Sequence, residues 1–401
     1  MSKVLVLPGN DWQIPLVNRI IEMGHDVCVV SPEDDSPCKK IAKRYMKSDI
    51  FDVDHIEVFA KSESVDAIIS DECDIAMPVI AELGRRLNLS TISVNEAALY
   101  TDKFRMREFC KKEGLNFPEY KLCHDIEEAV IFLNEIRTSV IIKPIDSNAS
   151  HGVFTVNDEE QMRKHFDEAL SFSRIDKAVL VERFINGTEF TIDGIKTLSG
   201  HYTLAISEKK HYKHNPNIAN ELLFTHSNRE FDYEKLKAVN DRFVMSSGLK
   251  FGFTHAEYKY ENDEFYLIEI AARGGGNMIS GCITQFMSGC DTYEYLVKSS
   301  IEKPYFEDFT IREDCKNRAS VLKFFETPNN GGVVRSVLGL DYLIEEEDIK
   351  YWKLNFNTGD TISPALNDSV RIGFYIACCE NENKLKHVME NVKEKFEIKL
   401  D

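Results

Sequence analysis

The sequence predicts an α/β protein of two or three domains, with a parallel sheet at its N-terminal end. Short apolar runs alternate with helical patterns over the first hundred residues, which is typical of a parallel sheet covered by helices. The length of 401 residues corresponds to two or three domains, at roughly 100–200 residues per domain. With 43% hydrophobic and 29% charged residues, the chain can bury a sizeable core and does not resemble a disordered protein.

The first hundred residues predict a scaffold domain. A helix capped by Asn10 or Asp11 ends near Gly24, and a second helical pattern follows Asp71 and Glu72. The first strand ends without the GxGxxG fingerprint, so the sequence does not predict dinucleotide binding. The expected strands span residues 4–7, 27–30 and 67–69.

The rest of the chain continues the mixture of strands and helices. A charged helix over 101–114 ends at the C-cap Gly114. We expect a small-residue loop at 147–152 and a long polar loop at 209–220, which contains Asn-Pro-Asn. From about residue 315 a smaller unit mixes short strands with turns. The expected strands are 140–143, 179–182, 189–195, 202–207, 255–260 and 265–270, and the expected helices are 158–172 and 233–246.

Charge and cysteine content exclude several classes of function. The net charge of −18 argues against sequence-independent binding of nucleic acid, which needs a basic face. No apolar run approaches the ~20 residues of a membrane-spanning helix, and the N-terminus does not resemble a signal peptide. The ten cysteines are scattered without a CxxC pair, so we expect reduced thiols in the cytoplasm.

Two glutamates on a predicted hairpin are the most informative feature. Glu257 and Glu269 face each other if the connection has an odd number of residues centred on Asp263. Opposed like charges destabilise a strand pair, and Mg²⁺ is the hard cation that takes carboxylate oxygens and substrate phosphates. Arg273 falls on the same face, which suits phosphoryl or acyl-phosphate chemistry. A solvated hairpin is the alternative at this point.

Glycines follow Arg273 directly, as Gly274, Gly275 and Gly276. Glycines let backbone N–H groups approach an anion, and a helix that starts after them would direct its dipole at that anion. A flexible turn remains the alternative. His255 shares the face of Glu257, although a lone histidine on a strand is more often a packing neighbour.

Two further segments indicate phosphate contacts. Lys143 ends an apolar strand before the small-residue loop, and a lysine beside such a loop can bind phosphate. Glu182 ends another apolar strand, and Glu189 follows it after a glycine turn; either carboxylate could be a structural ion pair. The basic island 209–214 could lie over phosphates or form a solvated loop.

Taken in order, these segments resemble the ATP-grasp superfamily of carboxylate–amine ligases. The resemblance implies a pre-ATP-grasp domain over 1–100, an ATP-grasp domain over 101–310 and a small α+β C-terminal subdomain over 311–401. It implies Mg²⁺, or Mn²⁺, on Glu257 and Glu269, with Arg273 as the catalytic residue that stabilises the acylphosphate. The amides of 274–276 would share this charge, and Gly275, Gly276 and Asn277 would contact substrate. The implied ATP-binding residues are Lys103, Lys143, Ser150, His151, Gly152, Val153, Glu182, Arg183, Phe184, Ile185 and Glu189.

The chain departs from the family pattern at one position. Ala271 stands where many members have an asparagine that completes the metal shell, so the number of metal ions stays open. The implied reaction forms an acylphosphate from ATP and a small-molecule carboxylate, which an amine then converts to an amide. The alternatives are a bicarbonate-dependent carboxylase or carbamoyl-phosphate type of enzyme, and a nucleotide-binding regulator without turnover. Homodimers are common in the family, but no feature identifies the acid, the amine or the assembly.

Overall fold

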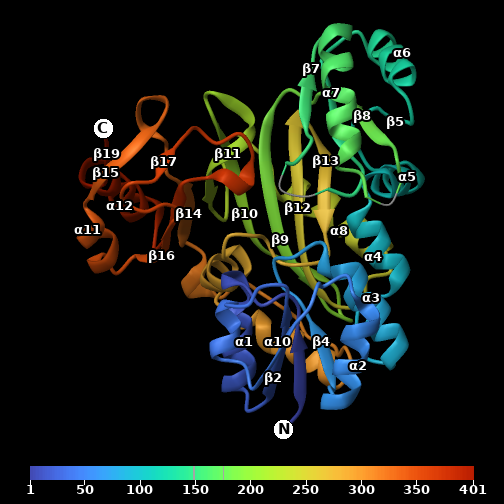
Figure 1. Ribbon diagram of the computed structural model, residues 1–401, viewed down its shortest axis with the longest axis vertical. Coiled ribbons are helices and arrows are strands. Elements are labelled where there is room, and N and C mark those ends of the chain that lie inside the picture. The colour runs from blue at the N-terminus through green and yellow to red at the C-terminus, as the bar shows by residue number, and fades with distance from the viewer. Residues whose placement is uncertain (148–149, 175) are drawn as a thin grey trace.

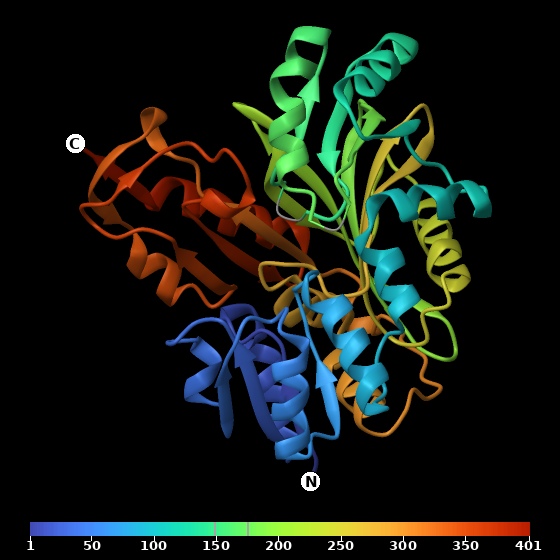
Figure 2. The same cartoon turned by 45° about the vertical axis from the view of Figure 1, so that its right-hand side comes forward.

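The computed structural model describes residues 1–147, 150–174 and 176–401, and shows three parts that meet at the centre of the molecule (Figures 1 and 2). The N-terminal part lies below, a small antiparallel sheet with two helices lies above, and the C-terminal part lies to one side. In these residues, no helix has the length and apolar character that crossing a membrane requires.

The N-terminal part is the predicted parallel sheet with helices on both faces. Its strand order is β3-β2-β1-β4, and every pairing is parallel. Alternating residues of the first strand face opposite sides, because Val4 and Val6 join one core cluster while Leu5 and Leu7 join another. The strands are β1 (Lys3–Val6), β2 (Asp26–Ser31), β3 (Arg44–Lys47) and β4 (Ala67–Ile69), and the helices are α1 (Ile14–Glu22), α2 (Val53–Glu63), α3 (Ala76–Leu87) and α4 (Val94–Thr101).

An eight-stranded antiparallel sheet joins the centre of the chain to its C-terminal part. Its order is β13-β12-β9-β10-β11-β14-β18-β16, so strands from both regions form one continuous surface. The strands are β9 (Thr188–Lys196), β10 (His201–Tyr212), β11 (Asn215–Phe224), β12 (Gly252–Glu261), β13 (Glu264–Ala271), β14 (Ala319–Phe324), β16 (Ile349–Leu354) and β18 (Gly373–Cys379).

A separate four-stranded antiparallel sheet, in the order β5-β8-β6-β7, has its own core. Met162 and Phe166 of one covering helix are buried in that core with residues of the strands. The elements are β5 (Tyr120–Cys123), β6 (Val140–Pro144), β7 (Phe154–Val156), β8 (Val179–Arg183), α6 (Ile126–Ile136) and α7 (Glu159–Ser171).

Most of the remaining helices cover the large sheet and the C-terminal part, whereas the helix Thr292–Ile301 also packs against α1 and β4 of the N-terminal part. Asp102 caps the helix that begins at Lys103, and Gly114 ends it in the left-handed conformation, as the sequence predicts. The helices are α5 (Lys103–Glu113), α8 (Tyr233–Ser246), α9 (Gln285–Ser288), α10 (Thr292–Ile301), α11 (Leu340–Glu345) and α12 (Glu382–Lys395), and a small third sheet contains β15 (Gly332–Leu338), β17 (Thr361–Ile362) and β19 (Glu397–Leu400).

The long loop predicted over 209–220 is wrong, because these residues form the hairpin of β10 and β11. The turn falls between Tyr212 and Asn215, which are ladder partners. Pro216 does not disrupt the pairing, since residues 216–218 lie in an irregular part of β11 without partners on β10. The correction brings the basic residues of this segment onto the large sheet.

The predicted opposition of Glu257 and Glu269 is confirmed, although the turn is not the predicted one. The hairpin turns through two residues, Asn262 and Asp263, with φ values of 52° and 63°. A two-residue turn alone would not place the glutamates opposite each other. A register shift between Glu257 and Tyr258 leaves one extra residue, Ile268, on β13, and this residue brings Glu269 opposite Glu257.

The helix expected directly after the three glycines begins later. Asn277 and Met278 have φ values of 57° and 67°, and a π-helical segment follows only at Ile279–Thr284. Six residues in this geometry do not provide the helix N-terminus that the sequence suggested.

Gly187, between β8 and β9, allows a close approach of two backbone segments. A Cβ atom at this position would lie 1.8 Å from the carbonyl oxygen of Tyr260. We therefore expect Gly187→Ala to lower the free energy of unfolding by about 1–3 kcal/mol, as overpacking does elsewhere. Urea denaturation would measure the change.

Gly200→Ala is the matched control, because its Cβ would meet only the Tyr202 side chain, at 3.4 Å. Equal stability of the two variants would contradict the close approach at Gly187.

Candidate active site

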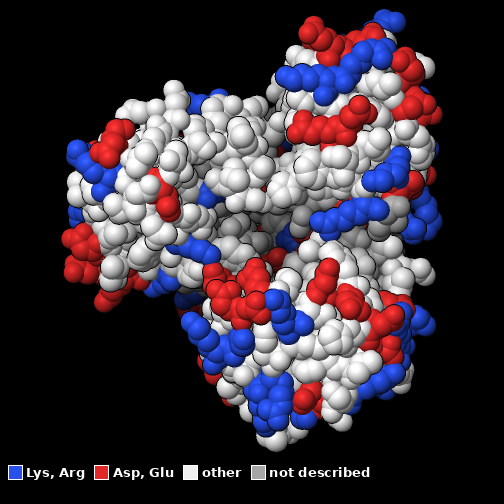
Figure 3. Space-filling model, viewed as in Figure 1, with Lys and Arg blue, Asp and Glu red and all other residues white. Residues whose placement is uncertain are grey.

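The three parts of the molecule enclose a cavity of about 560 Å³. Its walls include Trp12, Glu72 and Asp74 of the N-terminal part, and Phe324 and Phe374 of the C-terminal strands. The space-filling view shows the surface hollowed where the parts meet, with both acidic and basic side chains nearby (Figure 3). Strands β9, β10, β12 and β13 of the large sheet provide many of the charged residues of the cavity, and the others come from the N-terminal part, from Arg273 and from the C-terminal part.

The facing carboxylates of Glu257 and Glu269 line this cavity, and each pairs with a lysine. Lys209 Nζ lies 2.6 Å from Glu257 Oε1, and Lys103 Nζ lies 2.8 Å from Glu269 Oε1. Burial opposes the ionisation of Glu257, but the Lys209 ammonium outweighs it and lowers the pKa of this carboxyl well below its usual range. Glu257 is therefore a carboxylate at neutral pH.

Lys209 also pairs with Glu189, at 2.7 Å, and sequence reasoning gave it no role of its own. Burial raises the pKa of Glu189, but Lys209 and His211 outweigh burial and bring it to about 2. The basic island at 209–214 is thus partly built into the site. The sequence signal for this role is the alternation of basic residues, because residues two apart on a strand share one face, and Lys209 and His211 both line the cavity from β10.

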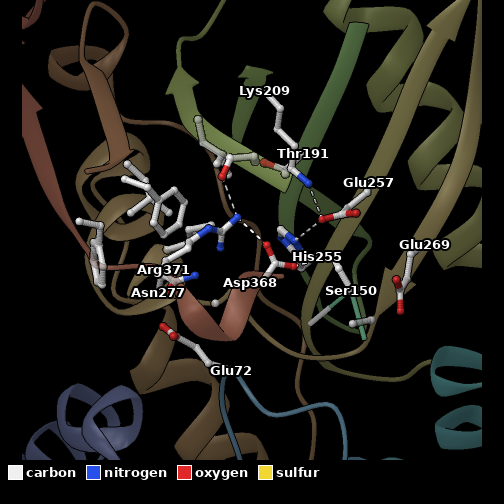
Figure 4. Close-up of a pocket in the computed structure, with 18 of the residues that line it drawn as sticks. Glu72, Ser150, Thr191, Lys209, His255, Glu257, Glu269, Asn277, Asp368 and Arg371 are labelled. Atoms are coloured by element: carbon white, nitrogen blue, oxygen red, sulfur yellow. Dashed lines mark hydrogen bonds and ion pairs between the residues drawn. The ribbon is translucent and has the colours of Figure 1, made fainter. Parts of the chain in front are cut away.

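His255 also lines the cavity. The sequence analysis favoured a packing role for this histidine over a place in the site. Its Nδ1 lies 2.8 Å from Oδ1 of the buried Asp193. Its Nε2 lies 3.9 Å from Glu257 Oε1, on the cavity side (Figure 4). Burial disfavours the imidazolium, but the Asp193 carboxylate prevails and raises the pKa of His255 to about 9. Gly275 must be small here, since a Cβ would lie 2.7 Å from Asp193 Oδ1 and 2.8 Å from His255 Nδ1.

Arg273 connects the central domain to the N-terminal part. Its Nε and Nη2 donate to the two carboxylate oxygens of Asp74, at 2.9 and 2.6 Å. The amide of Gly274 donates to Asp71, so the expectation that this amide holds an anion of the substrate is wrong. Gly276 and Asn277 line the cavity, as their predicted substrate role requires.

A buried cluster of charges lies between helix α5 and the small sheet. Glu182 accepts from Arg107 Nε and pairs with Lys143 Nζ, both at 2.6 Å, and all three side chains are almost fully buried. Burial raises the pKa of Glu182, but the two cations outweigh it and lower that pKa. Lys143 and Glu182 therefore form an ion pair. A structural ion pair was one of the two roles that the sequence allowed for Glu182.

The loop after β6 reaches the C-terminal part. Ser150 Oγ donates to Asp368 Oδ2 at 2.7 Å, and His151 Nε2 lies 3.1 Å from Ser369 Oγ. Asn148 and Ala149 of the predicted phosphate-covering loop lie outside the described residues. The described end of the loop thus closes over the cavity.

The structure brings only part of the predicted set to the cavity wall. Ser150, Glu189, Glu257, Glu269, Arg273, Gly276 and Asn277 line it. Lys103 reaches it through Glu269, whereas Arg183 pairs with Glu119 and Glu261 outside it. Lys143, His151, Gly152, Val153, Glu182, Arg183, Phe184, Ile185 and Gly275 do not line the cavity.

Comparison with known families identifies the central part of the chain. Residues 136–281 match the model of the ATP-grasp domain. These residues form an ATP-grasp domain. The predicted resemblance is confirmed, and so is the fold class, a mixed α/β structure with an N-terminal parallel sheet.

Curated relatives of the ATP-grasp protein include two synthetic enzymes. The formate-dependent phosphoribosylglycinamide formyltransferase of Methanococcus vannielii is 26% identical over 187 residues, which are 46% of this chain and 48% of the relative. The dapdiamide A synthase of Enterobacter agglomerans is 25% identical over 185 residues, 45% and 44% of the two chains. The chain thus spans about half the length of the curated relatives that it matches.

The whole fold also matches solved structures of other proteins. An L-amino acid ligase from Bacillus licheniformis is 18% identical, with a TM-score of 0.85 over 100% of this chain and 99% of the other. A phosphoribosylglycinamide synthetase from Anaerococcus prevotii is 19% identical, with a TM-score of 0.74 over 100% of both chains. At this identity the likeness concerns the fold alone.

Removing one partner of the buried charge cluster leaves an uncompensated buried charge. We expect Arg107→Met to lower the free energy of unfolding by about 3–5 kcal/mol. Thermal and urea denaturation would measure this change.

Arg163→Met is the control, because Arg163 pairs with Glu127 and Glu159 on the exposed surface. Its loss should change stability by at most about 1 kcal/mol. A small effect of Arg107→Met would show that the cluster does not stabilise the fold.

Proposed function

We propose that the protein is an ATP-dependent ligase that activates a carboxylate as an acylphosphate and joins it to an amine. The observation that carries the proposal is the facing pair Glu257 and Glu269, which shares one cavity with Arg273 in an ATP-grasp domain. Carboxylates, a guanidinium and buried lysines together suit chemistry in which the protein positions and stabilises phosphoryl groups. The ligase relatives support the same reaction class.

The two glutamates fit a divalent metal ion. Among the described residues, no three His, Cys, Asp or Glu side chains gather into a ready-made metal site. Mg²⁺ does not need one, because it binds through one or two carboxylates together with substrate phosphates. Glu257 and Glu269 would hold Mg²⁺, or Mn²⁺, with the number of ions open because Ala271 lines the cavity without an oxygen ligand in its side chain. When bound, the metal supplies positive charge to the phosphates.

Lys103 and Lys209 would neutralise the site and contact phosphate oxygens when nucleotide is present. Both ammonium groups are buried within 2.8 Å of a carboxylate at the cavity. A lysine contributes a point charge that can be shared between a carboxylate and a phosphate. The remaining ATP contacts, from Lys143, the loop at 150–153 and the segment 182–189, are part of the proposal.

Arg273 would stabilise the charge of the acylphosphate. Asp74 holds the guanidinium by two hydrogen bonds, so its orientation is fixed before substrate arrives. Closure of the loop at Ser150 over Asp368 would exclude water, which otherwise hydrolyses an acylphosphate.

The setting of the enzyme is also part of the proposal. All ten cysteines are free in the described residues, which supports a reducing compartment such as the cytoplasm. Residues 1–100, 101–310 and 311–401 would be the three structural units, although the large sheet continues across the last boundary. The partners would be a small carboxylate and a small amine, and a homodimer, which is common in the family, is the assembly to test.

The glutamate pair provides the direct test. We expect Glu257→Gln and Glu269→Gln each to reduce substrate-dependent phosphate release from MgATP by about 100-fold or more, since each removes a charge from the reacting phosphates. The assay measures phosphate release with a panel of small carboxylates and amines.

Glu264→Gln is the control, because Glu264 is also on β13 but pairs with Lys235 at the surface. Turnover with bicarbonate and no amine would favour the carboxylase type of enzyme. The proposal fails if MgATP binds tightly but no combination of substrates releases phosphate, which is the behaviour of a regulator.

A further inference from the structure

The cavity contains a buried arginine that the proposed chemistry does not use. Arg371 lines the wall formed by the C-terminal part, and its side chain is only 9% exposed. Its Nη2 donates to the carbonyl of Ala219 at 2.7 Å and pairs with Asp368 Oδ1 at 2.6 Å (Figure 4). Its Nε has no hydrogen-bond partner among the described residues. A buried guanidinium with an unfilled donor is costly unless a ligand completes it.

Apolar side chains surround this arginine. The guanidinium carbon lies 3.7 Å from the ring centroid of Phe324, and Trp12 packs against Phe374 with ring centroids 5.9 Å apart. Leu322 and Ile279 complete this part of the cavity lining. A ligand that reaches Arg371 therefore places its body against apolar and aromatic surface.

The charges of the cavity do not favour a phosphate group at Arg371. The three Lys and Arg side chains on the wall are each paired with a carboxylate: Lys209 with Glu189 and Glu257, Arg273 with Asp74, and Arg371 with Asp368. Burial and the neighbouring Asp71 raise the pKa of Glu72, another residue of the wall, well above its usual value. A phosphate dianion at Arg371 would carry a second negative charge, and the neighbouring carboxylates would repel it.

We propose that the amine substrate is an α-amino acid with an apolar side chain. Its carboxylate would contact Arg371, its side chain would pack against Trp12, Phe324 and Phe374, and its amine would face the end of the cavity with Glu257 and Arg273. This inference rests on the proposed ligase function and adds the class of amine. A carboxylate is a strong partner for a guanidinium, and a single negative charge suits an arginine that Asp368 already partly neutralises.

The reaction balances with this orientation. The amine nitrogen attacks the acyl carbon, a C–N bond forms, and the bond from that carbon to the phosphate oxygen breaks. Phosphate leaves with the electron pair. The ammonium group loses one proton to solvent before the attack and a second one after it, and the amide nitrogen keeps the third. The carboxylate on Arg371 takes no part and fixes the direction of the amine.

Binding can be measured without knowing the acid. Isothermal calorimetry with the full chain and Mg²⁺–AMP-PNP would compare L-phenylalanine with phenethylamine, which lacks the carboxylate, and with O-phosphoethanolamine. We expect phenylalanine to bind about 10–100-fold more tightly than phenethylamine, the range for a hydrogen bond to a charged group. We expect no competition from O-phosphoethanolamine.

Variants assign the effect to the residues. Arg371→Gln should remove the advantage of phenylalanine over phenethylamine, while Arg371→Lys should keep part of it, with folding of both checked by thermal denaturation. Trp12→Ala should weaken phenylalanine more than glycine. Equal weakening of phenylalanine and phenethylamine by Arg371→Gln would overturn the inference, because a merely structural arginine would affect both ligands alike.

The inference and the proposed function fail in different ways. If amines without a carboxylate or phosphorylated amines support phosphate release while apolar amino acids do not, the ligase stands and the inference falls. If no acid and amine release phosphate, the ligase falls, and the inference falls with it.

Discussion

Repulsion between two carboxylates held opposite each other is the constraint on which the site depends. Strand pairing fixes Glu257 against Glu269, and neither can withdraw without breaking the ladder of β12 and β13. Cations must therefore come from other elements, and they do: Lys209 from β10 and Lys103 from the start of α5. In the proposed function, this pair of carboxylates would hold a divalent cation, and the two lysines would contact phosphate oxygens.

The other parts of the molecule hold this centre in place. Arg107 and Lys143 enclose Glu182 where helix α5 meets the small sheet, which fixes the helix that begins with Lys103. Arg273 binds Asp74 across to the N-terminal part. The N-terminal sheet therefore contributes to the site through side chains at its edge, although it resembles a scaffold in sequence.

Local signals in the sequence were sufficient for most elements and for the glutamate pair, because apolar periodicity and capping residues report short-range structure. They failed where strand pairing prevails over a local turn signal. Asn-Pro-Asn at 215–217 indicates a loop, and only the ladder with β10 and β14 shows that a hairpin tolerates it. Arg371 lies about 100 residues beyond Arg273 in the chain. No local pattern connects the two, so the C-terminal wall of the cavity could not be predicted.

One carboxylate, Asp368, accepts a hydrogen bond from Ser150 of the loop and pairs with Arg371 of the wall. The loop after β6 and the C-terminal wall of the cavity thus share a single group. A ligand that moves Asp368 through Ser150 therefore alters the free energy of binding at Arg371, and the reverse also holds. By thermodynamic reciprocity, a ligand that strengthens the loop contact and a ligand that occupies the arginine change each other's affinity by the same factor. Cooperativity between the two ligands would then arise from this one shared carboxylate.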